Sequence, residues 1–136
     1  MELKTARLAA STTLHCLTGC TIGETLGLTI GVSLSWSPIS IALFATALAF
    51  VSGFALTLVP LTLQRGLKVI DALKLVWIGE VVSISAMEIA MNSVDVVLTG
   101  GAVLTLWVIP VMFTAGFFAA VPYNYWRLKA LGKACH

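Results

Sequence analysis

Three side chains able to hold a metal ion recur at every fourth position near the start of the chain: Cys16, Cys20 and Glu24. In an α-helix this spacing places all three close to one face. Thiolates select soft ions such as Cu(I). A carboxyl beside them can balance charge or take up the protons that thiols release on binding. His15 points about 100° away from Cys16 on such a helix, so it is a lesser candidate ligand.

A second set of such groups lies in residues 77–92, where Met87 and Met91 are also four positions apart. Thioethers share the preference of thiolates for soft ions. Glu80 and Glu88 fall on the same broad side of the helix predicted here. We therefore predict one intramembrane metal site built from both segments, with the candidate ligands His15, Cys16, Cys20, Glu24, Glu80, Met87, Glu88 and Met91.

The composition is that of an integral membrane protein. Hydrophobic residues make up 59% of the 136 residues and charged residues only 10%, with a mean hydropathy of +1.01. A soluble domain carries about 25% charged residues. We predict a single all-α domain, residues 1–136, with four transmembrane helices at about 8–34, 39–61, 74–94 and 102–126. No cleavable signal peptide is expected, because polar residues interrupt the first apolar stretch.

Three carboxyls, those of Glu24, Glu80 and Glu88, are expected inside the membrane-spanning helices. The first and third helices are expected to run parallel, which places Cys16 level with Glu80 and Glu24 level with Glu88. An ionised carboxylate is costly in hydrocarbon, and no lysine or arginine is predicted at this depth to pair with it. The expected partner is therefore a cation or a proton, and a carboxyl without its ion should be protonated.

Glycines also recur at every fourth position of the first helix. The resulting overlapping G-x-x-x-G units leave a stripe without side chains, against which a neighbouring helix can approach the backbone closely. We assign this stripe to helix packing, beside the thiol and carboxyl face. Its members are Gly19, Gly23, Gly27 and Gly31.

The basic residues predict the orientation. All eight lysines and arginines fall in the N-terminal arm, in the connection between the second and third helices, or in the C-terminal tail. By the positive-inside rule, both termini face the cytoplasm of a multi-pass protein of the inner membrane. The net charge of +2 is explained by this role and requires no nucleic-acid partner. Four helices leave little room for an internal pathway, so we expect a homo-oligomer in the lipid bilayer.

Two resemblances follow from these motifs. The pair Met87 and Met91, the G-x-x-x-G units and the terminal pair Cys135 and His136 resemble elements of the eukaryotic high-affinity copper transporter family. This resemblance implies Cu(I) as the ion, and the terminal pair would serve as a cytoplasmic metal relay. The chain departs from that family because four helices are expected rather than three, and because it has no methionine-rich outer arm.

The chain also resembles, over nearly its whole length, a family of small bacterial and archaeal membrane proteins of unknown function. The resemblance rests on a His-Cys-x-x-Gly-Cys-x-x-Gly-Glu signature at residues 15–24 and on the later segments Met87-Glu88-x-x-Met91-Asn92 and Pro122-x-Asn124-Tyr125-Trp126. It implies four helices and no particular activity.

Three functions remain open from the sequence. The first is a membrane protein that binds or transports a metal ion, with Cu(I) as the first choice and Zn(II) as the second. The next is an assembly subunit whose polar cluster holds helices together. The third is a membrane thiol oxidoreductase, although Cys16 and Cys20 lie in one helix and face the reducing side of the membrane. No nucleotide-binding loop is found, and we expect no enzymatic activity.

Overall fold

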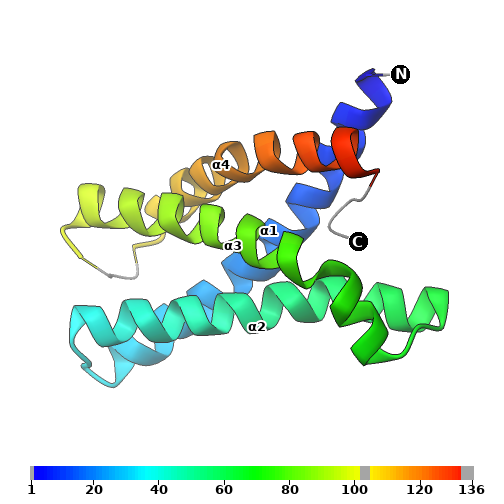
Figure 1. Ribbon diagram of the computed structural model, residues 1–136. Helices are drawn as coiled ribbons and strands as arrows, with labels where there is room; N and C mark the ends of the chain where they lie inside the picture. Colours follow the sequence, from blue (N-terminus) through cyan, green and yellow to red (C-terminus); the bar gives the residue numbers. More distant parts are fainter. Residues whose placement is uncertain (1, 102–104, 133–136) are drawn as a thin grey trace.

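The computed structural model describes residues 2–101 and 105–132 of the chain. These residues form four helices and no strand: α1 (Glu2–Ser33), α2 (Pro38–Arg65), α3 (Val69–Thr99) and α4 (Val108–Leu131). Figure 1 shows α3 and α4 side by side, α2 along one edge of the bundle, and α1 crossing obliquely beside them. The all-helical class predicted from the sequence is confirmed.

Three of the four helices, α2, α3 and α4, are long and apolar enough to cross a membrane. The structure therefore agrees with a multi-pass membrane protein. Helix α1 has 32 residues, so it is long enough to span a bilayer core of about 30 Å. Its histidine, glutamate and basic first turns make it less apolar than the other three.

Local signals explain where the helices begin and end. Ser37 caps the start of α2 by accepting a hydrogen bond from the Ser40 N–H, and Pro38 occupies the first helical position, where its missing N–H costs nothing. Helices α2, α3 and α4 each end at a glycine in the left-handed region, a backbone conformation that glycine adopts without a steric penalty. These residues are Gly66, Gly100 and Gly132.

Helices α1, α2 and α3 are longer than the sequence predicted, whereas α4 begins at Val108, later than the predicted start at about residue 102. The basic connection expected at residues 62–73 is mostly helical, and only residues 66–68 join α2 to α3. Helix α3 continues past the expected turn at Asp95 as far as Thr99, and α4 continues five residues past Trp126. The helices therefore extend beyond their apolar segments, and polar residues form their ends. Cys135 and His136, the predicted relay, lie outside the described residues.

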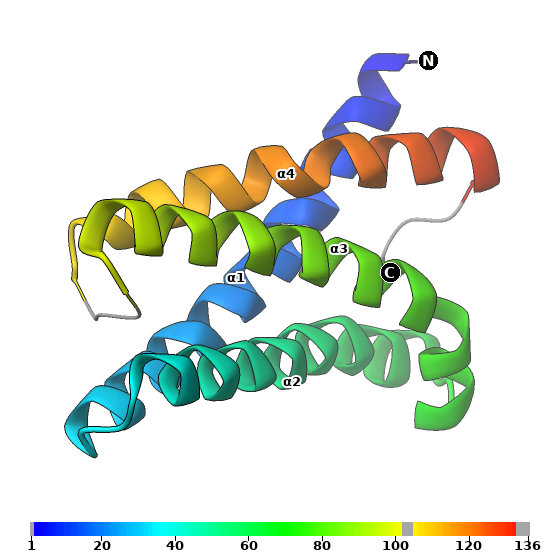
Figure 2. The ribbon, with the colours of Figure 1, turned by 60° about the vertical axis from the view of Figure 1, so that its left-hand side comes forward.

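The glycine stripe of α1 packs against α2. Figure 2 shows the C-terminal half of α1 beside α2 at the lower left. A Cβ atom added to Gly27 would overlap the backbone of Ala45, and one added to Gly19 would lie 3.0 Å from the backbone of Gly53. The two helices run antiparallel, and the stripe is in contact with α2 from Gly19 to Gly31, in agreement with the packing role expected of it.

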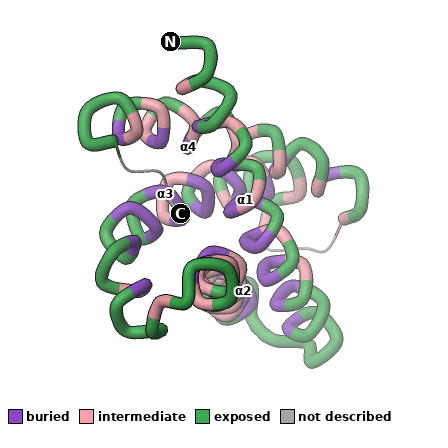
Figure 3. The backbone as a smooth tube through the Cα atoms, turned by 90° about the vertical axis from the view of Figure 1, so that its right-hand side faces the viewer, coloured by how far each residue is buried: buried purple, intermediate pink, exposed green. Residues whose placement is uncertain are grey.

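The core lies where the four helices face one another, as the buried segments in Figure 3 show. Helix α1 is in close contact with α2 and α4 but touches α3 along only a short stretch. The main core cluster nevertheless joins all four helices, because large side chains bridge the remaining distance. It contains Cys16, Leu17, Cys20, Ala49, Ile84, Met87, Met91, Val108, Met112 and Ala120.

Candidate functional site

A thiol and a carboxyl link α1 to α3 at the centre of the molecule. The Sγ atom of Cys16 donates a hydrogen bond to Oε2 of Glu80 across 3.2 Å. Both side chains are completely buried. The sequence predicted that Cys16 and Glu80 lie at the same depth in the membrane, and in the structure the two side chains are in contact.

The second thiol lies one turn further along α1. A Cβ atom added to Gly53 of α2 would lie 3.1 Å from Sγ of Cys20 and 3.0 Å from the Ile84 side chain. Cys20 thus occupies the space that the missing side chain of Gly53 leaves, between α2 and α3. Neither Cys16 nor Cys20 is joined in a disulfide.

A polar network connects α4 to the same region. The side-chain amide of Asn124 donates hydrogen bonds to Oγ1 of Thr13 at 2.8 Å and to Oγ of Ser83 at 3.1 Å. Thr13 in turn donates to the backbone carbonyl of Ala9 within its own helix. These side chains are buried, so one amide ties α1, α3 and α4 together. The sequence reasoning quoted Asn124 only within a family motif and gave it no role.

Arg127 corrects the expectation that no lysine or arginine lies at the depth of the buried carboxyls. It was placed in a cytoplasmic tail, but α4 continues through it and its side chain is only 6% exposed. Its guanidinium lies on the backbone of Gly79, where any side chain would overlap it. A buried arginine is therefore held directly beside the residue that precedes Glu80.

The Cys16–Glu80 pair forms one polar level between α1 and α3. A second polar level lies two helical turns further along these two helices. Glu24 of α1 is close enough to Glu88 and Asp95 of α3 for their charges to act on it. The amide of Asn92 donates to Oε2 of Glu88 at 3.3 Å, and the hydroxyl of Thr46 from α2 also bonds to Glu88. This proximity agrees with the similar depth expected for Glu24 and Glu88. Asp95, which the sequence reasoning assigned to a turn, joins them.

The methionines lie in the apolar core between the helices. Met87 and Met91 are buried there together with Met112, which was not among the predicted ligands. A Cβ atom added to Gly116 of α4 would lie 3.1 Å from Sδ of Met91 and 3.0 Å from Leu17. Met91 therefore fills the space beside a glycine, a packing role that its flexible side chain suits.

His15 is directed at α2, away from the thiols. Its Nε2 atom lies 2.9 Å from the backbone carbonyl of Leu56. This direction agrees with the angle of about 100° expected between His15 and Cys16 on the helix. His15 therefore lies on the face of the glycine stripe and not on the face of Cys16.

The eight predicted ligands are distributed over two levels rather than gathered at one point. Cys16 and Glu24, and likewise Glu80 and Glu88, are eight residues apart, which is about 12 Å along a helix. Among residues 2–101 and 105–132, no three His, Cys, Asp or Glu side chains lie close enough together to hold a metal ion. A metal site here would use fewer such ligands, or would form when side chains move.

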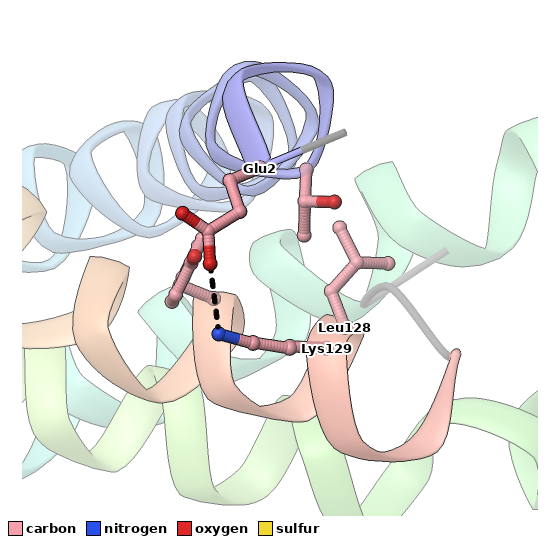
Figure 4. A pocket seen from close by; sticks show the side chains of 5 residues that line it. Glu2, Leu128 and Lys129 are labelled. Atoms are coloured by element: carbon pink, nitrogen blue, oxygen red, sulfur yellow. Dashed lines mark hydrogen bonds and ion pairs between the residues drawn. The ribbon is translucent and has the colours of Figure 1, made fainter.

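The C-terminal end of α4 forms a shallow pocket with the first turns of α1, shown in Figure 4. Its volume is about 260 Å³, and Lys129 Nζ crosses it to Oε1 of Glu2 at 3.1 Å. Both side chains are exposed, so we assign this ion pair to the surface and not to the site.

The chain belongs to a family described as "Domain of unknown function (DUF4396)", whose model matches residues 5–133. No curated protein and no solved structure matches the chain. The expected membership in a family of unknown function is confirmed, and this membership assigns no activity.

Proposed function

We propose that the protein binds a thiophilic cation within the membrane and moves it across, with Cu(I) as the first candidate and Zn(II) as the second. The observation that carries this proposal is the hydrogen bond between Cys16 and Glu80. A thiol must lose its proton before it binds a metal ion. The carboxylate that already accepts this hydrogen bond, 3.2 Å away, is placed to receive that proton.

The surroundings of this pair support an ion site. Thr57 lies one turn after Gly53 on α2. The residues of α1 and α3 that contact Gly53 each lie one turn after Cys16 and Glu80. Because α2 runs antiparallel to both α1 and α3, Thr57 is expected beside the Cys16–Glu80 pair. Its hydroxyl is buried and makes no hydrogen bond, so it is available to an ion or to a water molecule that the ion carries.

The proposal includes four membrane spans with both termini in the cytoplasm, in the inner membrane of the cell. The support for α1 as the fourth span is the contact of its glycines with residues 41–56 of α2, a helix that is itself apolar enough to cross. Basic residues of the described chain gather at one end of the bundle, including Arg65, Lys68 and Lys129. A homo-oligomer would supply the pathway that four helices alone leave narrow.

A structural role is the second candidate, and the Asn124 network favours it. One buried amide joins three helices through two hydrogen bonds, as expected of a residue that fixes how helices pack. In this view Cys16 and Glu80 are another interhelical contact of the same kind, and the protein is an assembly subunit.

A metal titration separates the two candidates. Protein carrying Cys135→Ser would be titrated with Cu(I) and with Zn(II), so that only the two buried thiols contribute. Adding Cys16→Ser and Cys20→Ser should abolish binding of the thiophilic ion while the helical content is unchanged. Equal binding by the serine variant, or no binding before the serines are introduced, would rule out the metal proposal and favour the structural role.

A further inference from the structure

Glu24 and Glu88 form a second polar level that has buried oxygens without a hydrogen bond. Both side chains are only 3% exposed, and burying a charged group without a partner is costly. One oxygen of each glutamate, Oε2 of Glu24 and Oε1 of Glu88, is fully buried and makes no hydrogen bond. These two oxygens belong to side chains on different helices that are close enough to interact electrostatically.

The groups around them are neutral or acidic. Asn92 and Thr46 each hydrogen-bond to Glu88, and the neighbouring charge on α3 is Asp95. Within the described chain neither Glu24 nor Glu88 forms an ion pair with a lysine or arginine. Positive charge must therefore come from outside the protein if both carboxyls are ionised.

A surface pocket lies beside this level, although Glu24 and Glu88 themselves do not line it. A pocket of about 150 Å³ opens between the start of α2 and the end of α3, and its lining includes Asn92, Asp95 and Pro38. A cavity of about 10–15 Å³ is enough for one water molecule, so this pocket can admit a partly hydrated ion. Asp95 lines the pocket and also acts on Glu24, so it connects the surface to the buried carboxyls.

We propose that Glu24 and Glu88 together bind a hard divalent cation that enters past Asp95 and Asn92. Two carboxylates balance the charge of one such ion. Carboxylate and amide oxygens suit Mg²⁺, Ca²⁺ and Mn²⁺, and small ions of this kind are commonly held by one or two carboxylates while they keep several waters. A site with two acidic ligands is compatible with the absence, in the described residues, of any group of three.

This site is distinct from the thiol pair in place and in chemistry. It lies about 12 Å further along α1 and α3, and its ligands are oxygens rather than sulfur. The inference therefore goes beyond the proposed binding of a thiophilic ion, and either site can fail without the other.

Binding of Mn²⁺ tests this inference directly. The full chain would be placed in nanodiscs of phosphatidylcholine, a zwitterionic lipid, and titrated with Mn²⁺ while electron paramagnetic resonance records the free ion. Empty nanodiscs give the blank. We expect one ion bound per chain, and at least about tenfold weaker binding for Glu24→Gln and for Glu88→Gln, since even outer-shell partners of a metal contribute this much.

Two matched variants make the result specific. Glu2→Gln removes an exposed carboxyl at the other end of the bundle and should leave the titration unchanged. Cys16→Ser with Cys20→Ser should also leave it unchanged, because the thiols belong to the other level. If a glutamine variant does not fold, Glu24→Asp replaces it: this change keeps the charge but withdraws the carboxylate by one methylene, and should weaken binding too.

Three outcomes would overturn the inference. The first is no Mn²⁺ bound by the unmodified chain above the blank. Another is equal binding by the unmodified chain and the variants of Glu24 and Glu88. The last is modification of either glutamate by a hydrophobic carbodiimide that excess Mn²⁺ does not prevent, which would show that the carboxyls hold protons instead.

Discussion

Replacing Gly23 by alanine tests the contact that holds α1 against α2. A methyl group at this position would overlap the backbone carbonyl of Leu48 and the hydroxyl of Ser52. The carbonyl belongs to the helix itself, so the two helices must separate to make room. Ser52 also donates a 2.6 Å hydrogen bond to the carbonyl of Gly19, and this bond would be stretched. At Gly31, by contrast, the nearest atoms to an added methyl belong to the Ile41 side chain, at 2.8 Å or more, so the overlap is smaller and does not involve the α2 backbone at those atoms.

The magnitude follows from three terms. Overpacking a tight contact costs about 1–3 kcal/mol, and an interhelical hydrogen bond in a membrane contributes about 0.6 kcal/mol. The better helix propensity of alanine offsets about 1 kcal/mol of this cost. We therefore expect Gly23→Ala to lower the free energy of unfolding by about 0.6–2.6 kcal/mol. Gly31→Ala should lower it by less, because its overlap is smaller and no hydrogen bond is stretched.

The assay is unfolding by sodium dodecyl sulfate, added to protein in mild detergent micelles and followed by circular dichroism. Gly101→Ala is the matched control, because a methyl group there would reach only ordinary contact, 3.9 Å from Pro38. If Gly23→Ala unfolds at the same detergent ratio as Gly31→Ala and the control, the close backbone contact described here is wrong.

Two further predictions concern the orientation and the polar network. Reporter fusions at Ser37 and Gly101 should read outside and one at Lys68 should read inside, because basic residues mark the cytoplasmic side; a reversed pattern would contradict the proposed topology. Asn124→Leu should lower the free energy of unfolding by about 1 kcal/mol, since both of its interhelical hydrogen bonds are lost. In thermal melts Lys129→Gln should be indistinguishable from the unmodified chain, because its ion pair is exposed, and an unchanged melt for the leucine variant would show that the network adds no stability.

The sequence predicted the helix class, the packing role of the glycines and the relative level of α1 and α3. These features depend on spacing along a helix, which sequence shows directly. Cys16 pairs with Glu80, and Glu24 lies beside Glu88, because parallel helices of similar length bring equivalent turns together. Which helix would cover the glycine stripe was not predicted, since four-residue spacing marks a face without naming its partner.

The residues that the sequence reasoning missed lie near helix ends that it placed too early. Arg127 was assigned to a basic tail and Asp95 to a turn, but both are buried inside longer helices. The signal that could have found them is the C-terminal glycine: Gly132 and Gly100 each lie five residues beyond these side chains and end the helix. Charge alone was a weaker guide, because an arginine can reach inward from the last turns of a membrane helix.

The unequal contacts of α1 have a consequence for how the molecule could move. Helix α1 is tightly held by α2 and also packs closely against α4, whereas its backbone approaches that of α3 at few points. Because α2 packs against α3 as well, a rocking of the α1–α2 hairpin against the α3–α4 hairpin would have to part these contacts, including the hydrogen bond from Asn124 to Thr13. Such a motion would alter both polar levels while the glycine contacts stay intact.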